Sequence, residues 1–189
     1  MKGLVVLGFL MSMVLCSCGN DSVSEEVTAV YADTSEESVS VRSDLSVEDI
    51  LDLVNESSKQ NRYCSLSKDN TVLSFDIETS EVYFRDSEGT VTKNNSSELS
   101  LFGLMLSEVQ AQDNVSISVE IDDYSIEGDV FYKVVTSYNV GEQVFCKDFF
   151  IDARNHVFVG VAYGNSGDLV SALPIIKVTY TDSPLVVES

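Results

Sequence analysis

Histidine is nearly absent from this chain, in which His156 is the only one. Zinc sites use three or four Cys, His or carboxylate ligands, and no such set is visible. The sequence also lacks a Cys-x-x-Cys pair, a Gly-x-Ser-x-Gly motif, and the Walker and dinucleotide-binding glycine patterns. These absences argue against zinc, thiol–disulfide and nucleotide-dependent enzymes. A Ser-His-Asp arrangement stays open on composition alone, but we interpret His156 as a surface or strand-end residue.

Basic residues are also scarce, with 11 Lys and Arg against 31 Asp and Glu. All the acids follow residue 17, whereas Lys2 precedes it, so the chain without its first 17 residues has a net charge of 10 − 31 = −21. Such a surface repels nucleic acid and anionic lipid. The charge indicates solubility and spacing from a membrane, or else association with a cationic partner.

The chain has no apolar run long enough to span a bilayer, which requires roughly 20 apolar residues. The longest such run, Gly3 to Leu15, is mainly apolar, follows Met1-Lys2 and leads into Leu15-Cys16-Ser17-Cys18. A cation, a short apolar region and a small residue before a cysteine are typical of a secretory signal peptide. An unlipidated secreted protein and an uncleaved anchor are the alternatives.

The ending of this segment resembles the lipobox of bacterial lipoproteins, with Leu15 at −3, Ser17 at −1 and Cys18 as lipid acceptor. The resemblance implies cleavage before Cys18, a diacylglyceryl group on its sulfur and further acylation, as by palmitate, of the new N-terminus. Two or three acyl chains hold a protein firmly at a membrane. We therefore expect a lipid-anchored, extracytoplasmic protein of the cell membrane or outer membrane, and Gly19 leans toward the outer one.

Four segments follow from composition. Residues 1–17 are the predicted signal peptide, and residues 18–45 are an acidic, Ser-rich stretch that we predict to be a flexible tether. Residues 46–182 are predicted to form one domain, and residues 183–189 a tail.

Only Cys64 and Cys146 remain as free side chains once Cys16 leaves with the signal and Cys18 carries lipid. An extracytoplasmic compartment permits a disulfide between Cys64 and Cys146. Two separate buried thiols are an equally good interpretation.

The period of the apolar residues changes several times along the domain. Ser46 is a predicted cap for a helix whose apolar stripe is Val47, Ile50, Leu51 and Val54. Residues 62–93 alternate with period two and predict three or four short strands. Ser97 is the predicted cap of a second, more apolar helix from Glu98 to about Gln112. Four further strands are predicted at 115–121, 131–138, 144–151 and 157–163, then one helical turn at 168–173 and a last strand or helix at 175–180.

This order predicts an α+β fold, an antiparallel sheet meander packed against two helices in a single domain behind a disordered tether. The stretch from Glu98 to Tyr180, a helix followed by an antiparallel run, faintly resembles the PsbP/Mog1-like fold, which also occurs in bacterial lipoproteins. The resemblance covers about eighty residues and implies no functional residue.

Candidate sites in the domain are weak. Asp122, Asp123, Glu127 and Asp129 cluster and suggest a calcium site or a glycoside-hydrolysing pair, although chance clustering is expected in so acidic a chain. Residues 160–167 are Gly-rich and indicate a strand end and turn. The aromatics of the second strand series are expected to be mostly core, with a ligand-binding face as the minority interpretation: Tyr132, Tyr138, Phe145, Phe149, Phe150, Phe158 and Tyr163.

The sequence therefore predicts a non-enzymatic, membrane-anchored lipoprotein that binds a protein partner or small ligand, with no cofactor, metal or nucleic acid. A small extracytoplasmic hydrolase and a structural envelope protein are the alternatives.

Overall fold

A computed structural model describes residues 42–124, 129–165 and 174–185. The chain divides into two parts, Met1–Ser40 and Val41–Ser189, and every described residue belongs to the second part. The predicted signal peptide, Cys18 and most of the predicted tether lie outside the described residues. Within the described ranges, no helix has the length and apolar character needed to cross a membrane.

Helix α2, Val47–Ser58, begins where the sequence predicts. The Ser46 hydroxyl accepts a hydrogen bond from the Asp49 N–H at 3.1 Å, and the Asp49 carboxylate accepts the Ser46 N–H at 2.9 Å. This reciprocal pair satisfies backbone donors that the start of a helix leaves unpaired. Ile50 and Val54 are fully buried, so the predicted stripe does face the interior.

Four strands follow α2 and confirm the first predicted meander. They are β1 (Tyr63–Lys68), β2 (Thr71–Asp76), β3 (Glu81–Arg85) and β4 (Val91–Asn95). Each pairs antiparallel with the next, and Leu66, Leu73 and Phe84 are cross-strand partners that are all buried. The period-two pattern therefore places one apolar row on one face of these strands.

Helix α3 spans Leu101–Gln110 and starts three residues later than the sequence suggests. Ser100, not Ser97, is its N-cap, and the Ser100 hydroxyl accepts the Gly103 N–H at 3.1 Å. Leu99, inside the predicted helix range, lies before the observed helix and is 58% exposed. The prediction was wrong because both serines precede apolar residues, and local sequence does not distinguish between them.

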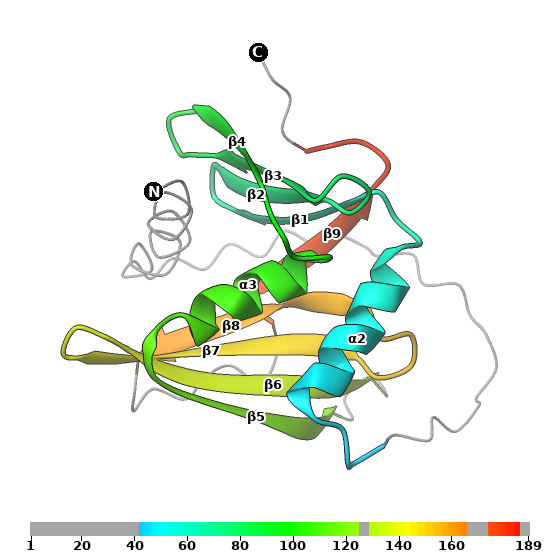
Figure 1. Cartoon of the computed structure of the whole chain (residues 1–189), viewed down its shortest axis with the longest axis vertical. Coiled ribbons are helices and arrows are strands. Elements are labelled where there is room, and N and C mark those ends of the chain that lie inside the picture. Colours follow the sequence, from blue (N-terminus) through cyan, green and yellow to red (C-terminus); the bar gives the residue numbers. More distant parts are fainter. Residues whose placement is uncertain (1–41, 125–128, 166–173, 186–189) are drawn as a thin grey trace. The chain divides into compact units, whose positions relative to one another are not determined.

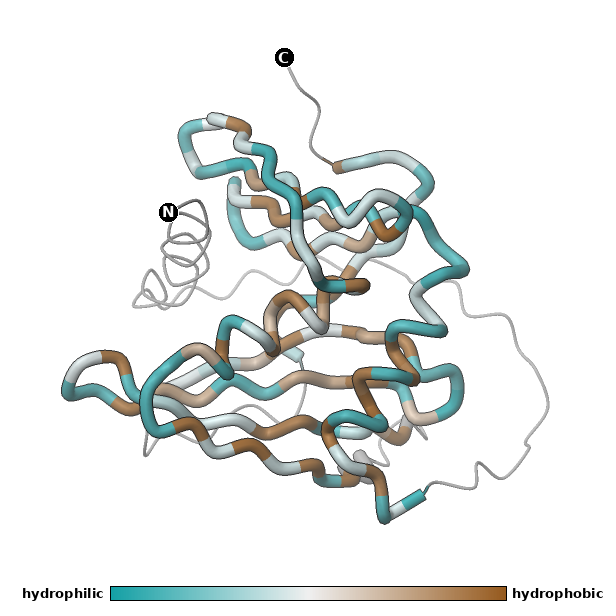
Figure 2. The backbone as a smooth tube through the Cα atoms, in the orientation of Figure 1, coloured by the Kyte–Doolittle hydropathy of each residue, from teal (hydrophilic) through white to brown (hydrophobic). Residues whose placement is uncertain are grey.

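The second meander consists of β5 (Asp113–Tyr124), β6 (Asp129–Val140), β7 (Gln143–Asp152) and β8 (Phe158–Asn165). All four strands were predicted, and each is longer than its predicted range. Hydrophobic and hydrophilic residues alternate along β5, as Figure 2 shows. The Phe102 ring of α3 contacts Phe149 of β7 and Phe158 of β8, with centroids 5.4 and 5.6 Å apart.

The last strand, β9 (Ile176–Thr181), joins the two meanders. It pairs with β1 on one side and β8 on the other, so the sheet order is β4-β3-β2-β1-β9-β8-β7-β6-β5. Contact with β8 is close, because a Cβ placed on Gly160 would lie 2.4 Å from the Ile176 carbonyl oxygen. A glycine is therefore required at position 160. The position of β9 in the sheet was not predicted from the sequence.

The described residues thus form a mixed α+β structure with one antiparallel nine-stranded sheet and two helices. Both helices are drawn in front of β5–β8 in Figure 1. The predicted helical turn at 168–173 lies outside the described residues.

Candidate binding cleft

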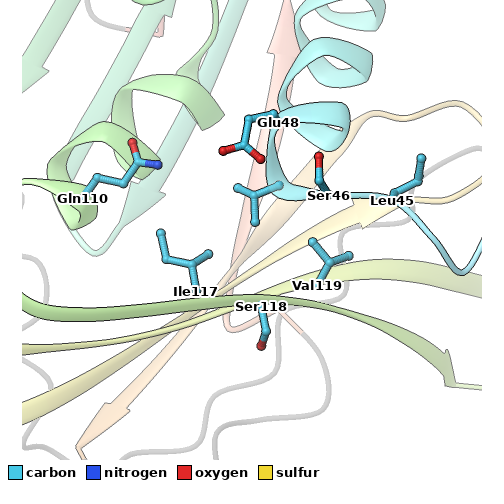
Figure 3. A pocket seen from close by; sticks show the side chains of 8 residues that line it. Leu45, Ser46, Glu48, Gln110, Ile117, Ser118 and Val119 are labelled. Carbon is cyan, nitrogen blue, oxygen red and sulfur yellow. The ribbon is translucent and has the colours of Figure 1, made fainter.

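A cleft of about 420 Å³ lies between the start of α2, the end of α3 and strand β5. Figure 3 shows Ile117 and Val119 of β5 facing Glu48 of α2 and Gln110 of α3, whereas Ser118 points away. The lining is Leu45, Ser46, Val47, Glu48, Gln110, Ile117, Ser118 and Val119. The floor of the cleft is thus apolar and its rim is polar.

The alternation of β5 explains this arrangement. Neighbouring strand residues point to opposite faces, and Ile117, Val119 and Ile121 share the face that lies beneath the helices. Ile117 and Val119 are half-buried, while Ile121 is 40% exposed. The apolar row of β5 is therefore only partly covered.

Strand β5 is an edge strand that pairs only with β6 among the described residues. The Ala153 N–H bonds to the Val130 carbonyl, so Val130 and every second residue after it direct their backbone groups at β7. The intervening β6 residues bond to β5, and their partners there are Ser116, Ser118, Glu120 and Asp122. The backbone N–H and C=O groups of Ile117, Val119 and Ile121 consequently point outward from the sheet.

The two helices and the strand around the cleft contain only acidic charged residues, and Arg42, in the segment before α2, is paired with Asp44. Helix α2 contains four Asp or Glu, α3 contains one and β5 contains four, and none of the three contains Lys or Arg. Glu48 and Glu120 are exposed beside the cleft and on β5, respectively. The local potential therefore favours a positively charged ligand.

Near its end, α3 carries the half-buried Glu108, which interacts with the buried Lys147 and Tyr138 of the sheet. Burial raises the pKa of Glu108 to about 7, and the charge of Lys147 opposes that rise. Burial lowers the pKa of Lys147. The pKa of Tyr138 rises to about 12 through burial and the nearby Glu108 carboxylate. This group was not predicted from the sequence, although Lys147 alternates with Phe145 and Phe149 and therefore shares their inward face.

A second buried pair lies on the opposite face of the same strands. Lys133 Nζ is 2.9 Å from Asp148 Oδ2, and both side chains are largely buried. Asp148 Oδ1 has no hydrogen-bond partner among the described residues, and burial raises the pKa of Asp148 despite the lysine. Lys133 also lies 5.6 Å from the centre of the Phe150 ring.

His156 lies in the turn between β7 and β8, as predicted for a strand-end residue. Its backbone φ is +58°, and its carbonyl accepts the Ser57 hydroxyl of α2 at 2.7 Å. The imidazole stacks on Tyr132 with ring centroids 6.3 Å apart. These contacts give His156 a role in joining the turn to α2 and β6.

Cys64 and Cys146 are both free thiols, on β1 and β7 respectively. Strands β9 and β8 lie between them, and three interstrand spacings amount to roughly 14 Å, far beyond the reach of a disulfide. The disulfide considered from the sequence is therefore not formed in this fold. Burial raises the pKa of Cys64 to about 12, which disfavours the reactive thiolate form.

Three of the four predicted acidic residues lie together at one end of the β5–β6 hairpin. Asp122, Asp123 and Asp129 belong to β5 and β6, Glu127 lies outside the described residues, and no group able to hold a metal occurs within those that are described. Residues 160–165 of the Gly-rich stretch belong to β8. The aromatics are mostly core, as expected, and those that are buried are Tyr132, Tyr138, Phe145, Phe149, Phe150 and Phe158.

Comparison with protein families, curated proteins and solved structures found no match. The resemblances to a bacterial lipoprotein signal and to the PsbP/Mog1-like fold therefore stay predictions.

Proposed function

We propose that this chain is a non-enzymatic lipoprotein, anchored through acylated Cys18 at the outer side of a bacterial membrane, that binds a protein partner or small ligand. In this proposal residues 46–182 form a single domain whose helices pack on the sheet. The observation that carries it is the sequence Leu15-Cys16-Ser17-Cys18 at the end of a short apolar run.

The stretch between Cys18 and the first described residue, Arg42, supports a tethered arrangement. It is rich in Ser and acidic residues, a composition that favours a flexible chain. A flexible segment of this length reaches roughly 25 Å, which is enough to hold a small domain clear of lipid headgroups.

The cleft beside β5 supports binding as the domain's task. It combines an apolar floor, a polar rim and an unpaired strand edge, features that suit recognition of another molecule.

The anchor is tested by replacing the acceptor sulfur. Cys18→Ala should move the protein from the membrane fraction to the soluble extracytoplasmic fraction, and the wild-type N-terminal fragment should gain the mass of a diacylglyceryl group. Cys16→Ala is the matched control, because Cys16 would leave with the signal peptide and its replacement should not change fractionation. A Cys18→Ala variant that stays with the membrane would contradict the proposal.

A further inference from the structure

We propose that the outer edge of β5, together with the cleft beside it, binds an extended segment of another protein whose residues alternate between apolar and basic side chains. The segment would add to the sheet as a tenth strand, next to β5. This inference rests on the proposed binding function and names its partner.

The backbone of β5 provides the first part of the argument. Ile117, Val119 and Ile121 direct their N–H and C=O groups away from β6, and no described strand accepts them. An added strand gains its affinity from hydrogen bonds to such groups. β5 is 12 residues long, so it offers several consecutive pairs.

The side chains of the same three residues provide the second part. They lie on the face that carries the cleft, and the cleft continues their apolar surface to Leu45 and Val47 of α2. Alternate residues of an added strand would lie on this face. Apolar side chains at those positions would cover Ile117 and Val119 and enter the cleft.

The charge of β5 determines which side chains fit at the remaining positions of the bound segment. On the other face, an added strand would run beside Ser116, Ser118 and the exposed Glu120, in a strand that contains four acids and no base. Opposite charges on neighbouring strands are favourable and like charges are unfavourable. Basic residues therefore fit there, and a second copy of this chain, with its own acidic β5, does not.

The opposite edge of the sheet, strand β4, has features that discourage pairing with a further strand. β4 has only five residues, and its Lys93 is paired with Glu81 at 2.9 Å. Short length and lysine are common devices against unwanted pairing. β5 contains neither lysine nor proline, so its acids exclude acidic strands while leaving the edge open to basic ones.

The test uses the full chain, purified in detergent, and three synthetic peptides of equal length. The first alternates lysine with valine, the second has the same composition with all lysines before all valines, and the third alternates glutamate with valine. We expect the alternating basic peptide to bind at least tenfold more tightly than either of the others by calorimetry. Equal binding of the two basic peptides would overturn the proposal, because it would reveal charge attraction without strand pairing.

Variants locate the site. Val119→Pro removes an N–H that the fold leaves unused, since proline is tolerated where a strand's N–H faces solvent, and it should weaken binding at least tenfold. Val91→Pro is the matched control, because the same reasoning from the Ser96 N–H bond to the Ser80 carbonyl places the Val91 backbone on the outer side of β4. That variant should bind normally, and comparable losses in both would contradict the site.

Charge is tested separately. Glu120→Lys should weaken binding of the basic peptide about fivefold or more and improve binding of the glutamate peptide, whereas Glu88→Lys, at an exposed turn between β3 and β4, should do neither. Hydrogen exchange should show new protection at Ile117, Val119 and Ile121 when the basic peptide is bound. Protection confined to other residues would overturn the assignment. Because these measurements do not depend on acylation, failure here leaves the Cys18 result standing, and the reverse also holds.

Discussion

Two buried carboxylates, one in each meander, are treated differently by this fold. Asp76 at the end of β2 is 1% exposed, and its Oδ1 accepts the backbone N–H groups of Glu78 and Thr79 at 3.0 and 3.2 Å. Asp148 in β7 is equally buried, but its Oδ1 has no hydrogen-bond partner in the part of the chain that the structure describes, and its pKa is raised by burial. A buried charge stabilises a fold only where its hydrogen bonds are made, so we expect Asp76 to stabilise the protein more than Asp148 does.

The same contrast extends to the surroundings of each carboxylate. In the first meander, Glu81 has a pKa lowered by its hydrogen bond from Lys93, then by that from Tyr83. Beside the second, burial has the largest effect on Glu108 of α3 and on Lys147 of β7, and it shifts both pKa values toward the neutral forms. We therefore expect the charged side chains to stabilise the first meander and to destabilise the second.

The largest expected effect is at Asp76. Asp76→Ala leaves two backbone donors unpaired in a part-buried turn, and we expect a loss of about 2–4 kcal/mol in the free energy of unfolding. Urea denaturation measures it.

Asp86→Ala is the matched control. Asp86 Oδ1 also accepts two backbone N–H groups, from Glu88 and Thr90, but in an exposed turn where water can replace it. The loss in the free energy of unfolding caused by Asp86→Ala should be about 1 kcal/mol or less. Equal losses at the two positions would show that burial does not decide the value of these bonds.

A smaller and pH-dependent effect is expected at Glu108. Its folded-state pKa of about 7 exceeds the ordinary value of 4.5, so the folded chain binds more protons between these values and stability falls as the pH rises through this window. Glu108→Gln abolishes that fall and should stabilise the protein at pH 8 by about 1–3 kcal/mol relative to wild type. The gain should disappear near pH 4.

Unfolding curves at pH 4, 6 and 8 check this prediction. Glu142→Gln, at an exposed turn, controls for the loss of one negative charge from an acidic chain. A pH-independent difference at Glu108 would show that the carboxyl is not desolvated.

The smallest effect, of opposite sign, is expected at Glu81. A lowered carboxyl pKa adds stability above its ordinary value, and that stability is lost as the pH falls through the folded-state pKa. Glu81→Gln should therefore slightly destabilise the protein at pH 7 and match wild type in strong acid. The same pH series tests it, and stabilisation at pH 7 would remove the contrast between the meanders.

Much of the local structure was predictable, since it depends on neighbours in sequence. Ser46 with Asp49 three residues later predicts a capped helix, and the alternation at Ile117 and Val119 predicts a strand with two distinct faces. The start of α3 was predicted wrongly, because Ser97 and Ser100 offer the same local signal. The Ser100 hydroxyl also donates to Asn55 Oδ1 of α2 at 2.6 Å, a tertiary contact that the local sequence does not reveal.

The candidate site was not predictable to the same degree. Ile117 and Val119 form a cleft floor only because Leu45 and Glu48 of α2 and Gln110 of α3 lie opposite them. From the sequence, the acids at 122, 123, 127 and 129 were the candidate site residues. In the structure, the candidate binding edge is formed by the apolar residues Ile117, Val119 and Ile121.

By itself, the sequence determined the periods of the helices and strands, the acidic charge and the Cys18 motif, because each depends on residues close together in the chain. The tertiary structure alone decided that β9 lies between β1 and β8, that Cys64 and Cys146 are separated, and that β5 is an edge strand among the described strands. The physical reason is that strand pairing joins residues distant in sequence, and many pairings satisfy the same local pattern. Only the packed sheet selects one of them.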